Sequence, residues 1–313
     1  MLRYIARRVI IAVFVLFVIV SLTFFLVQLI PGNVAQTILG DGATPSQIAH
    51  VNHALGLDRP IGARFLSFWG DTLRGNLGQS LLTGESVKES IANALPVTLS
   101  LTIVATLLTG LLGVALGVLS AIRGGWMDRL VRGGTSVGMA LPTFWLGVIL
   151  VFVFSVKLRL LPATGFTSLA SSPRLWAEDL VLPVVAVGLA GVAGISRQTR
   201  SAMLQTLGMD YVRSLRAQGI PKRSIIYKHA LRNAAIPIVT NIGFQFIGIL
   251  GGAVFIEEIF ALPGMGQLTN TAVQQHDLPI VQGAVIVMAG LVVAINLIVD
   301  VVLLFLNPKT RGS

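Results

Sequence analysis

The stretch "VIIAVFVLFVIVSLTFFLVQLI", residues 9–30, contains no charged residue and is long enough to cross a lipid bilayer as a helix. Three arginines, Arg3, Arg7 and Arg8, precede it, and no small-residue cleavage site follows it. These flanks favour a retained membrane anchor over a cleaved signal peptide. The stretch therefore places the chain among membrane proteins.

Composition supports a membrane protein and excludes several kinds of site. The 313 residues are 54% hydrophobic and only 12% charged, about half the charged fraction of a soluble domain. Without cysteine, the chain forms no disulfide, zinc–thiolate site or cysteine nucleophile. It contains no G-x-x-x-x-G-K-[S/T] loop for nucleotide phosphates, and a metal site at His50 and His53 is disfavoured because no third ligand stands near. We expect no catalytic site, cofactor site or metal site in this chain.

Five further apolar runs follow the first one, so the sequence predicts an all-α integral membrane protein with six transmembrane helices. The fourth run is the shortest. The predicted spans are residues 9–30, 97–122, 133–156, 180–195, 236–256 and 280–306.

Two connections between spans are long and define the predicted organisation. Residues 1–30 form the N-terminal tail and first span, and residues 31–95 form an extracytoplasmic insertion after it. Residues 96–306 form the transmembrane core, which includes a long loop at 197–235. Residues 307–313 form a tail.

Basic residues are strongly biased to one side of the predicted membrane. If both termini are cytoplasmic, 16 of the 23 Lys and Arg residues lie inside with two acids, whereas seven lie outside with ten acids. The net charge is then +14 inside and −3 outside, as the positive-inside rule expects. The rule accounts for the overall charge of +10 without nucleic acid as a partner.

The segment "RSLRAQGIPKRSIIYKHALRN", residues 213–233, is basic and amphipathic in a chain that is otherwise apolar. Gly219 and Pro221 divide it into two short helices, since glycine suits a helix C-terminus and proline a helix start. Ile225, Ile226 and His229 recur at helical spacing after the break. The pattern predicts a helix–turn–helix in the long cytoplasmic loop.

Three functions fit such a segment. It could lie on anionic lipid as an interfacial helix. DNA binding is disfavoured because the segment is tethered between two spans. Docking into a groove on a cytoplasmic protein is favoured, since the Gly–Pro break fixes a shape that lipid adsorption does not require.

The segment resembles the coupling loop of permease subunits in bacterial ABC importers. The motif of that loop is Glu-Ala-Ala, three residues, a glycine, nine residues and an apolar-x-Leu-Pro ending. Gly219 and Leu231 match the glycine and the leucine. The chain departs from the general motif with "RSL" at 213–215 in place of Glu-Ala-Ala, with His229 at the apolar position and with Arg232 at the proline. These departures resemble the peptide-importer branch, in which "HALRNA" is usual.

Other landmarks of the peptide-importer branch stand in order along nearly the whole chain. The closest likeness is to the first of the two permeases in dipeptide and oligopeptide importers, which carries the long outer segment. The landmarks are "LGLDRPIGARF" (55–65), "GNLGQSL" (75–81), "ALPVTLSLTIVA" (94–105) and "IEEIFALPGMGQL" (256–268).

The resemblance implies a type I ABC importer permease fold in the bacterial inner membrane. The implied partners are a second homologous permease, one or two ATP-binding subunits or a fused double ATPase, an extracytoplasmic substrate-binding protein, membrane lipid and a peptide substrate. ATP and Mg²⁺ would be bound by the ATPase. The predicted ATPase-coupling residues are Ala217, Gly219, Ile225, Ile226, His229 and Leu231.

Polar residues within or beside the last two spans are candidates for the translocation path or the outer gate, because such residues usually face protein or water. For Asp300 an ion pair with a nearby Arg or Lys is an alternative. The candidates are Asn241, Gln245, Glu257, Glu258, Asn296 and Asp300.

Other transport classes and other cargoes remain possible at the level of sequence. A secondary transporter driven by an ion gradient would be expected to show inverted repeats and midplane ionisable groups, and we find neither apart from Asp300. An ion channel would not explain the long basic loop. Within the ABC class, nickel or glutathione could replace peptides as the cargo.

Overall fold

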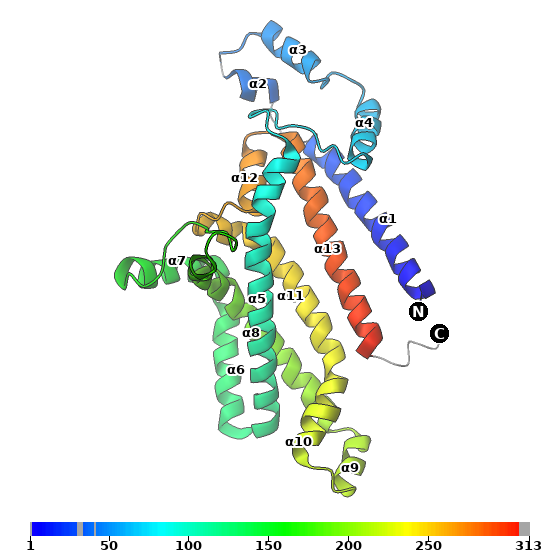
Figure 1. Cartoon of the computed structure of the whole chain (residues 1–313), viewed down its shortest axis with the longest axis vertical. Helices are drawn as coiled ribbons and strands as arrows, with labels where there is room; N and C mark the ends of the chain where they lie inside the picture. The colour runs from blue at the N-terminus through cyan, green and yellow to red at the C-terminus, as the bar shows by residue number, and fades with distance from the viewer. Residues whose placement is uncertain (1, 30–33, 41, 307–313) are drawn as a thin grey trace. The chain divides into compact units, whose positions relative to one another are not determined.

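The computed structural model describes residues 2–29, 34–40 and 42–306 and shows them to be almost wholly helical (Figure 1). No β-strand forms in these residues, where an isolated antiparallel bridge joins Gln79 to Ser86. The predicted all-α class is therefore confirmed. The predicted tail at 307–313 lies outside the described residues.

Five helices of the described chain are long and apolar enough to cross a membrane, judged by length and composition. Four of them contain a predicted span and extend beyond it at one end or both, whereas the first, α1, begins before its predicted span and ends at Val27. The five helices are α1 (Leu2–Val27), α5 (Val87–Arg123), α8 (Pro173–Leu207), α11 (Leu231–Ile259) with the short turns before it, and α13 (Leu278–Leu306).

The predicted third span is broken. The sequence predicted one span over 133–156. The structure contains α6 (Gly125–Ala140), followed after a bend of 95° by α7 (Thr143–Leu150) and a π-helical turn η1 (Val151–Lys157). Proline disfavours helical dihedrals in the residue before it, and Leu141, which precedes Pro142, has an extended ψ of 124°. Counted as one bent span, this pair brings the number of spans to the predicted six.

The fourth span is longer than the sequence indicated. α8 begins where the Ser172 hydroxyl accepts a hydrogen bond from the Leu175 N–H at 3.3 Å, and Pro173 occupies its first position. The helix continues to Leu207, well into the predicted 197–235 loop. The first third of that loop is therefore part of α8.

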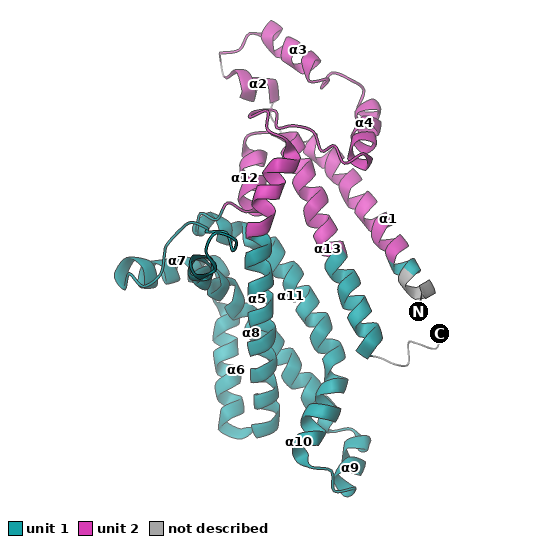
Figure 2. Cartoon of the chain, in the orientation of Figure 1, with its two compact units in different colours: residues 1–8, 98–262, 294–313 teal, residues 9–97, 263–293 magenta. Residues whose placement is uncertain are grey.

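The chain divides into two compact units, coloured separately in Figure 2. One consists of residues 1–8, 98–262 and 294–313. Within it, α8 packs against α6, α7 and α11. It also packs closely on α5, because a Cβ atom added to Gly117 would lie only 2.6 Å from the Ser196 carbonyl oxygen. Gly113 and Gly117 of α5, which have no side chain, thus permit the close approach of the two helices.

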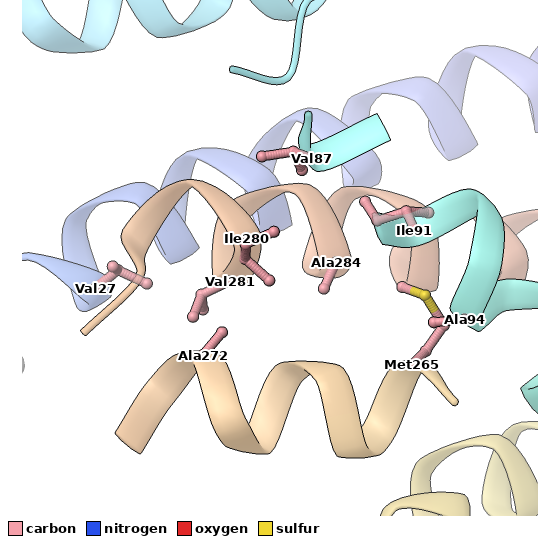
Figure 3. Close-up of a cluster of buried hydrophobic side chains, with 9 residues drawn as sticks. All are labelled: Val27, Val87, Ile91, Ala94, Met265, Ala272, Ile280, Val281 and Ala284. Carbon is pink, nitrogen blue, oxygen red and sulfur yellow. The ribbon is translucent and has the colours of Figure 1, made fainter. Parts of the chain in front are cut away.

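The second unit consists of residues 9–97 and 263–293. It contains three short helices of the outer segment, α2 (Val34–Leu39), α3 (Pro45–Ala54) and α4 (Ile61–Leu73). Its apolar core joins the ends of α1 and α5 to α12 (Met265–Gln274) and α13, and Figure 3 shows Ala272 and Val281 facing each other across it.

A buried carboxylate holds the loop before α5 in this unit. Asp277, which is 4% exposed, accepts hydrogen bonds from the Ser80 hydroxyl and from the Leu81 N–H, the latter at 3.2 Å. These bonds fix the loop against the turn that precedes α13. Part of the predicted outer segment is therefore folded onto the span-bearing helices.

Candidate functional site

The predicted helix–turn–helix is present, and its turn is closed by two backbone hydrogen bonds. α9 (Asp210–Ala217) ends with a bond from the Gly219 N–H to the Arg216 carbonyl at 3.0 Å and one from the Ile220 N–H to the Leu215 carbonyl at 3.1 Å. This pair defines a Schellman motif, in which the residue after the helix cap is left-handed. Gly219 occupies that position with φ +76°.

The requirement for glycine at position 219 concerns the backbone and not the available space. A Cβ atom added there would meet no heavy atom within 4 Å. A side chain would still be strained, because L-residues with a Cβ rarely adopt a positive φ. The predicted bend at Gly219 is thus present, for the reason the sequence indicated.

After the turn, the chain enters a helix that continues into the fifth span. α10 (Lys222–Ser224), the π-helical turn η2 (Ile225–Ala230) and α11 follow without a break, so that 38 residues from Lys222 to Ile259 form one helical element. The turn is therefore joined to the fifth span by continuous helix.

Two predicted coupling residues face inward. Ile225 is 3% exposed and Ile226 is 6% exposed, and Ile226 packs in an apolar cluster with Val118 of α5 and with Met203 of α8. The sequence pattern assigned both isoleucines to a face open to another protein. The structure differs because the apolar face of the second helix is covered by α5 and α8 of the same chain.

The side chains that remain exposed around the turn form what we call the basic tip. It consists of Arg213, Arg216, Lys222, Arg223, Lys228 and Arg232. Ala217 and Tyr227 are also exposed, whereas His229 and Leu231 are half-buried. The one acid of α9, Asp210, pairs with Arg213 at 3.3 Å, so the tip carries a net positive charge.

A pocket of about 550 Å³ lies behind the turn. It is bounded by the C-terminal ends of α5 and α8 and by the two helices of the segment. Its lining residues are Ala121, Ile122, Leu207, Arg216, Gly219, Ile220, Lys222, Ile225 and Ile226.

A hydrogen bond between side chains, which the sequence analysis did not predict, joins the two helices of the segment. The Asn233 amide of α11 donates a hydrogen bond of 2.7 Å to the Tyr211 hydroxyl of α9. Beside it, Val212 is fully buried. The signal available in the sequence is weak, since both polar residues are ordinary for an exposed loop.

A second contact missed at the level of sequence joins three helices near the segment. Asp128 of α6, which is 7% exposed, accepts hydrogen bonds from Arg200 of α8 and from the Ser120 hydroxyl of α5. Arg132 also lies 3.2 Å from the same carboxylate. A lone acid among several arginines on the predicted cytoplasmic side was a possible signal, but the sequence gives no means of choosing which arginine it meets.

The two adjacent acids at the end of α11 have different surroundings. Glu257 is fully buried, and its carboxylate accepts a hydrogen bond of 2.5 Å from the Thr98 hydroxyl of α5. Its backbone carbonyl accepts a bond from the Leu262 N–H at 2.8 Å, which helps to fix the loop after α11. Glu258 is exposed.

The other predicted path residues have separate surroundings, and none of the contacts described here joins one of them to another. Gln245 lies against Gly191 of α8, so close that a Cβ atom there would be 2.7 Å from the amide nitrogen. Asp300 pairs with Arg8 at 3.1 Å, as its alternative interpretation predicted. Asn241 is half-buried and Asn296 is exposed.

Comparison with known proteins decides the family. The family described as the binding-protein-dependent transport system inner membrane component matches residues 113–312, and a second family, covering the N-terminal part of such components, matches residues 1–102. This chain belongs to the binding-protein-dependent permease family.

Permeases of this kind include relatives that match along the whole chain. A putative peptide transport system permease of Brucella abortus is 37% identical, with 98% of each chain covered. A di/tripeptide transport system permease of Pseudomonas aeruginosa is 38% identical, with 99% of each chain covered. The MetNI methionine ABC transporter, solved in inward-facing conformations, contains a chain with the same fold at a TM-score of 0.54 and 17% identity, covering 69% of this chain and 96% of that one.

The boundary between the two family regions does not coincide with a structural boundary in this permease. The N-terminal match ends at residue 102 and the main match begins at residue 113, yet α5 runs unbroken from Val87 to Arg123 through both positions. The helix–turn–helix, the basic tip and the Asp128 contact all lie within the main match.

Proposed function

We propose that this permease carries dipeptides or oligopeptides inward across the bacterial inner membrane, driven by ATP hydrolysis in a separate subunit. The names of its relatives support a peptide as the cargo. The observation that carries the mechanism is the single helical element from Lys222 to Ile259, with a fixed turn at its N-terminal end.

The proposed assembly contains a second homologous permease, one or two ATP-binding subunits or a fused double ATPase, and an extracytoplasmic substrate-binding protein. Six spans from one chain then form half of the translocation pathway. ATP and Mg²⁺ are bound by the ATPase, and this chain holds no cofactor. Both termini are cytoplasmic in this proposal, which the charge bias of +14 inside against −3 outside supports.

In the proposed mechanism the turn at Gly219 contacts the ATPase. A helix rises 1.5 Å per residue, so the 38-residue element extends roughly 57 Å from the turn. Closure of the ATPase moves the turn, and the continuous helix tilts the fifth span with it. Alternating access follows as rigid-body movement of helices.

The contact with the ATPase involves the basic tip together with the exposed Ala217, Gly219 and Tyr227. Ile225, Ile226 and Leu231 support this surface from behind, because the isoleucines are buried and Leu231 is half-buried. His229, also half-buried, lies at the edge of the surface. We infer that the groove on the ATPase is acidic, since the tip offers several cations and few acids.

Roles in gating or in the pathway are proposed for the outer and intramembrane polar residues. Glu257 fixes the loop after α11 to α5, and Glu258 faces outward beside it. Asn241, Gln245 and Asn296 are proposed to face the second permease or the path. Asp300 serves to pair with Arg8.

The test is transport by the complex purified from native membranes with its bound subunits and reconstituted in vesicles. We expect uptake of a radiolabelled dipeptide that requires the binding protein, and ATP on the side of the ATPase. Uptake driven by a proton or sodium gradient without ATP would overturn the proposal in favour of a secondary transporter. Uptake of nickel or glutathione, with no uptake of peptides, would keep the mechanism and correct the cargo.

A further inference from the structure

Helix α4 (Ile61–Leu73) has two distinct lines of residues along its surface. Arg64, Ser67 and Asp71 follow one another at intervals of three and four residues and form a polar line. Leu66 and Leu73, seven residues apart, form an apolar line elsewhere on the helix. The helix is therefore amphipathic.

A third set of residues on α4 packs against the first span. The rings of Phe65 and Phe68 lie 5.4 Å and 5.2 Å from the ring of Phe24, measured between centroids. The ring of Trp69 lies 4.8 Å from that of Phe17, and its indole N–H donates a hydrogen bond of 3.2 Å to the Ser21 hydroxyl. These contacts anchor α4 to α1.

The contacts also fix the depth of α4 in the membrane. Phe17 lies ten residues before Val27, the end of α1, which corresponds to about 15 Å along the helix. It is near the middle of the apolar stretch Ala6–Val27, which is the right length for a bilayer core. Phe65 and Phe68, one turn apart on α4, both meet the ring of Phe24, which lies only three residues, or about 5 Å, before Val27. α4 therefore crosses α1 near that end, at the depth of the membrane interface, and the Trp69 side chain reaches inward to Phe17.

The apolar line of α4 is not covered by this chain. Leu66 is 73% exposed and Leu73 is 80% exposed, and Trp69 lies between them in sequence while packing on α1. Phe14, on the neighbouring surface of α1, is 64% exposed. At this depth, the simplest occupant of such a surface is the hydrocarbon that surrounds α1.

We propose that α4 is a membrane-interfacial helix whose Leu66–Leu73 line contacts the acyl chains of phospholipids. The leaflet is the one that holds the C-terminal half of α1, which is the outer leaflet in the orientation proposed above. The polar line of α4 then faces water and lipid headgroups, as in other interfacial helices that combine aromatic and aliphatic residues with a polar face. Part of the segment expected to lie outside the membrane is thus embedded in it.

The absence of native cysteine permits a direct test by nitroxide labelling of single cysteines. Leu66→Cys and Leu73→Cys probe the apolar line, and Ser67→Cys and Asp71→Cys are matched controls on the same helix. Phe14→Cys provides a reference in lipid and Ser46→Cys, on exposed α3, a reference in water. Each labelled permease is reconstituted with its complete complex in phosphatidylethanolamine–phosphatidylglycerol vesicles.

The readout is the accessibility of each label to oxygen, which concentrates in hydrocarbon, and to a water-soluble nickel chelate. We expect positions 66 and 73 to match Phe14→Cys, with high oxygen and low nickel accessibility, and positions 67 and 71 to approach Ser46→Cys. High nickel accessibility at 66 and 73 would show a water-exposed helix and overturn the proposal. Low accessibility to both reagents would also overturn it, because it would show that another protein subunit covers this line. None of these outcomes depends on the cargo or on ATP.

Discussion

Asp128 and Arg200 form a bidentate ion pair between α6 and α8, with the Arg200 Nε at 2.5 Å from one carboxylate oxygen and Nη2 at 2.9 Å from the other. Because Ser120 of α5 donates to the same carboxylate, three helices meet at one side chain. The bond therefore fixes these helices to one another close to the helix–turn–helix, where Val118 of α5 and Met203 of α8 pack against Ile226.

Loss of this buried ion pair should lower the stability of the subunit more than loss of an exposed ion pair. Asp128→Ala leaves Arg200 without its bidentate acceptor, so we expect a lower melting temperature and less subunit in the membrane. Asp210→Ala, which removes the exposed pair with Arg213, is the control and should have little effect. The exchange Asp128→Arg with Arg200→Asp should recover part of the loss; no recovery would indicate that the carboxylate acts by another contact.

Substitutions at Gly219 should rank by their tolerance of a positive φ and not by their size. We expect Gly219→Asn to retain most substrate-stimulated ATPase activity, because asparagine tolerates a positive φ. Gly219→Ala and Gly219→Leu should lose it to a similar extent, because an added Cβ atom meets no heavy atom within 4 Å and size is therefore not limiting. The strain amounts to about 1 kcal/mol or more. Gly208→Ala, at a negative φ of −85°, is the control. A loss that grows steadily with side-chain volume would contradict this explanation.

Ile226 and Tyr227 should behave differently although they are neighbours. Ile226→Ala removes a buried side chain and should destabilise the subunit by about 2–5 kcal/mol, so that its level in the membrane falls. Tyr227, 54% exposed, should tolerate alanine in stability and lose mainly ATPase stimulation. Thermal denaturation and stimulated ATPase activity, measured on the same preparations, separate the two effects. Normal stability of Ile226→Ala with loss of stimulation would restore Ile226 to the contact surface.

The basic tip should make association with the ATPase sensitive to salt. We expect the combined variant Lys222→Glu, Arg223→Glu and Lys228→Glu to lose the ATPase subunit during purification, whereas Arg223→Ala alone is mild. Raising the ionic strength should weaken the native complex, because salt screens the attraction between the basic tip and an acidic groove. If apolar contacts held the complex instead, salt would have less effect on it. An association that does not change with salt would contradict an acidic groove.

The orientation can be tested by labelling single cysteines in intact cells. Ser46 and Ser214 are both exposed in the structure, the first in α3 and the second in α9. We expect an impermeant maleimide to label Ser46→Cys in intact cells and Ser214→Cys only after the membrane is opened. The reverse pattern would show that the termini lie outside.

The sequence was sufficient for the features that depend on local composition. Apolar runs identified the helices, and the left-handed turn at Gly219 follows from a glycine before Ile220-Pro221. Pro142 stands at the bend in the third span, but a proline alone does not predict a bend. Proline is tolerated in many membrane helices, including α5, α8 and α11 here. The consequence of a given proline therefore cannot be predicted from the sequence alone.

Features that depend on contacts between distant residues were not predictable. The pattern of Ile225 and Ile226 defines an apolar face but does not say whether that face meets the same chain or another protein. Similarly, Glu257 and Glu258 differ only by one position in the sequence, and only the packing of Thr98 distinguishes the buried one. Several arginines stand close to Asp128 along the chain, yet the one that binds its carboxylate in bidentate fashion is Arg200, 72 residues away.

The ion pair between Arg8 and Asp300 has a consequence for the biosynthesis of the protein. The ribosome delivers α1 to the membrane first and α13 last, so this bond forms only after nearly the whole chain has been made. A product of premature termination lacks Asp300 and leaves the first helix without this attachment. Such a product keeps the aromatic contacts between α1 and α4 but lacks the bond that joins the first helix to the last.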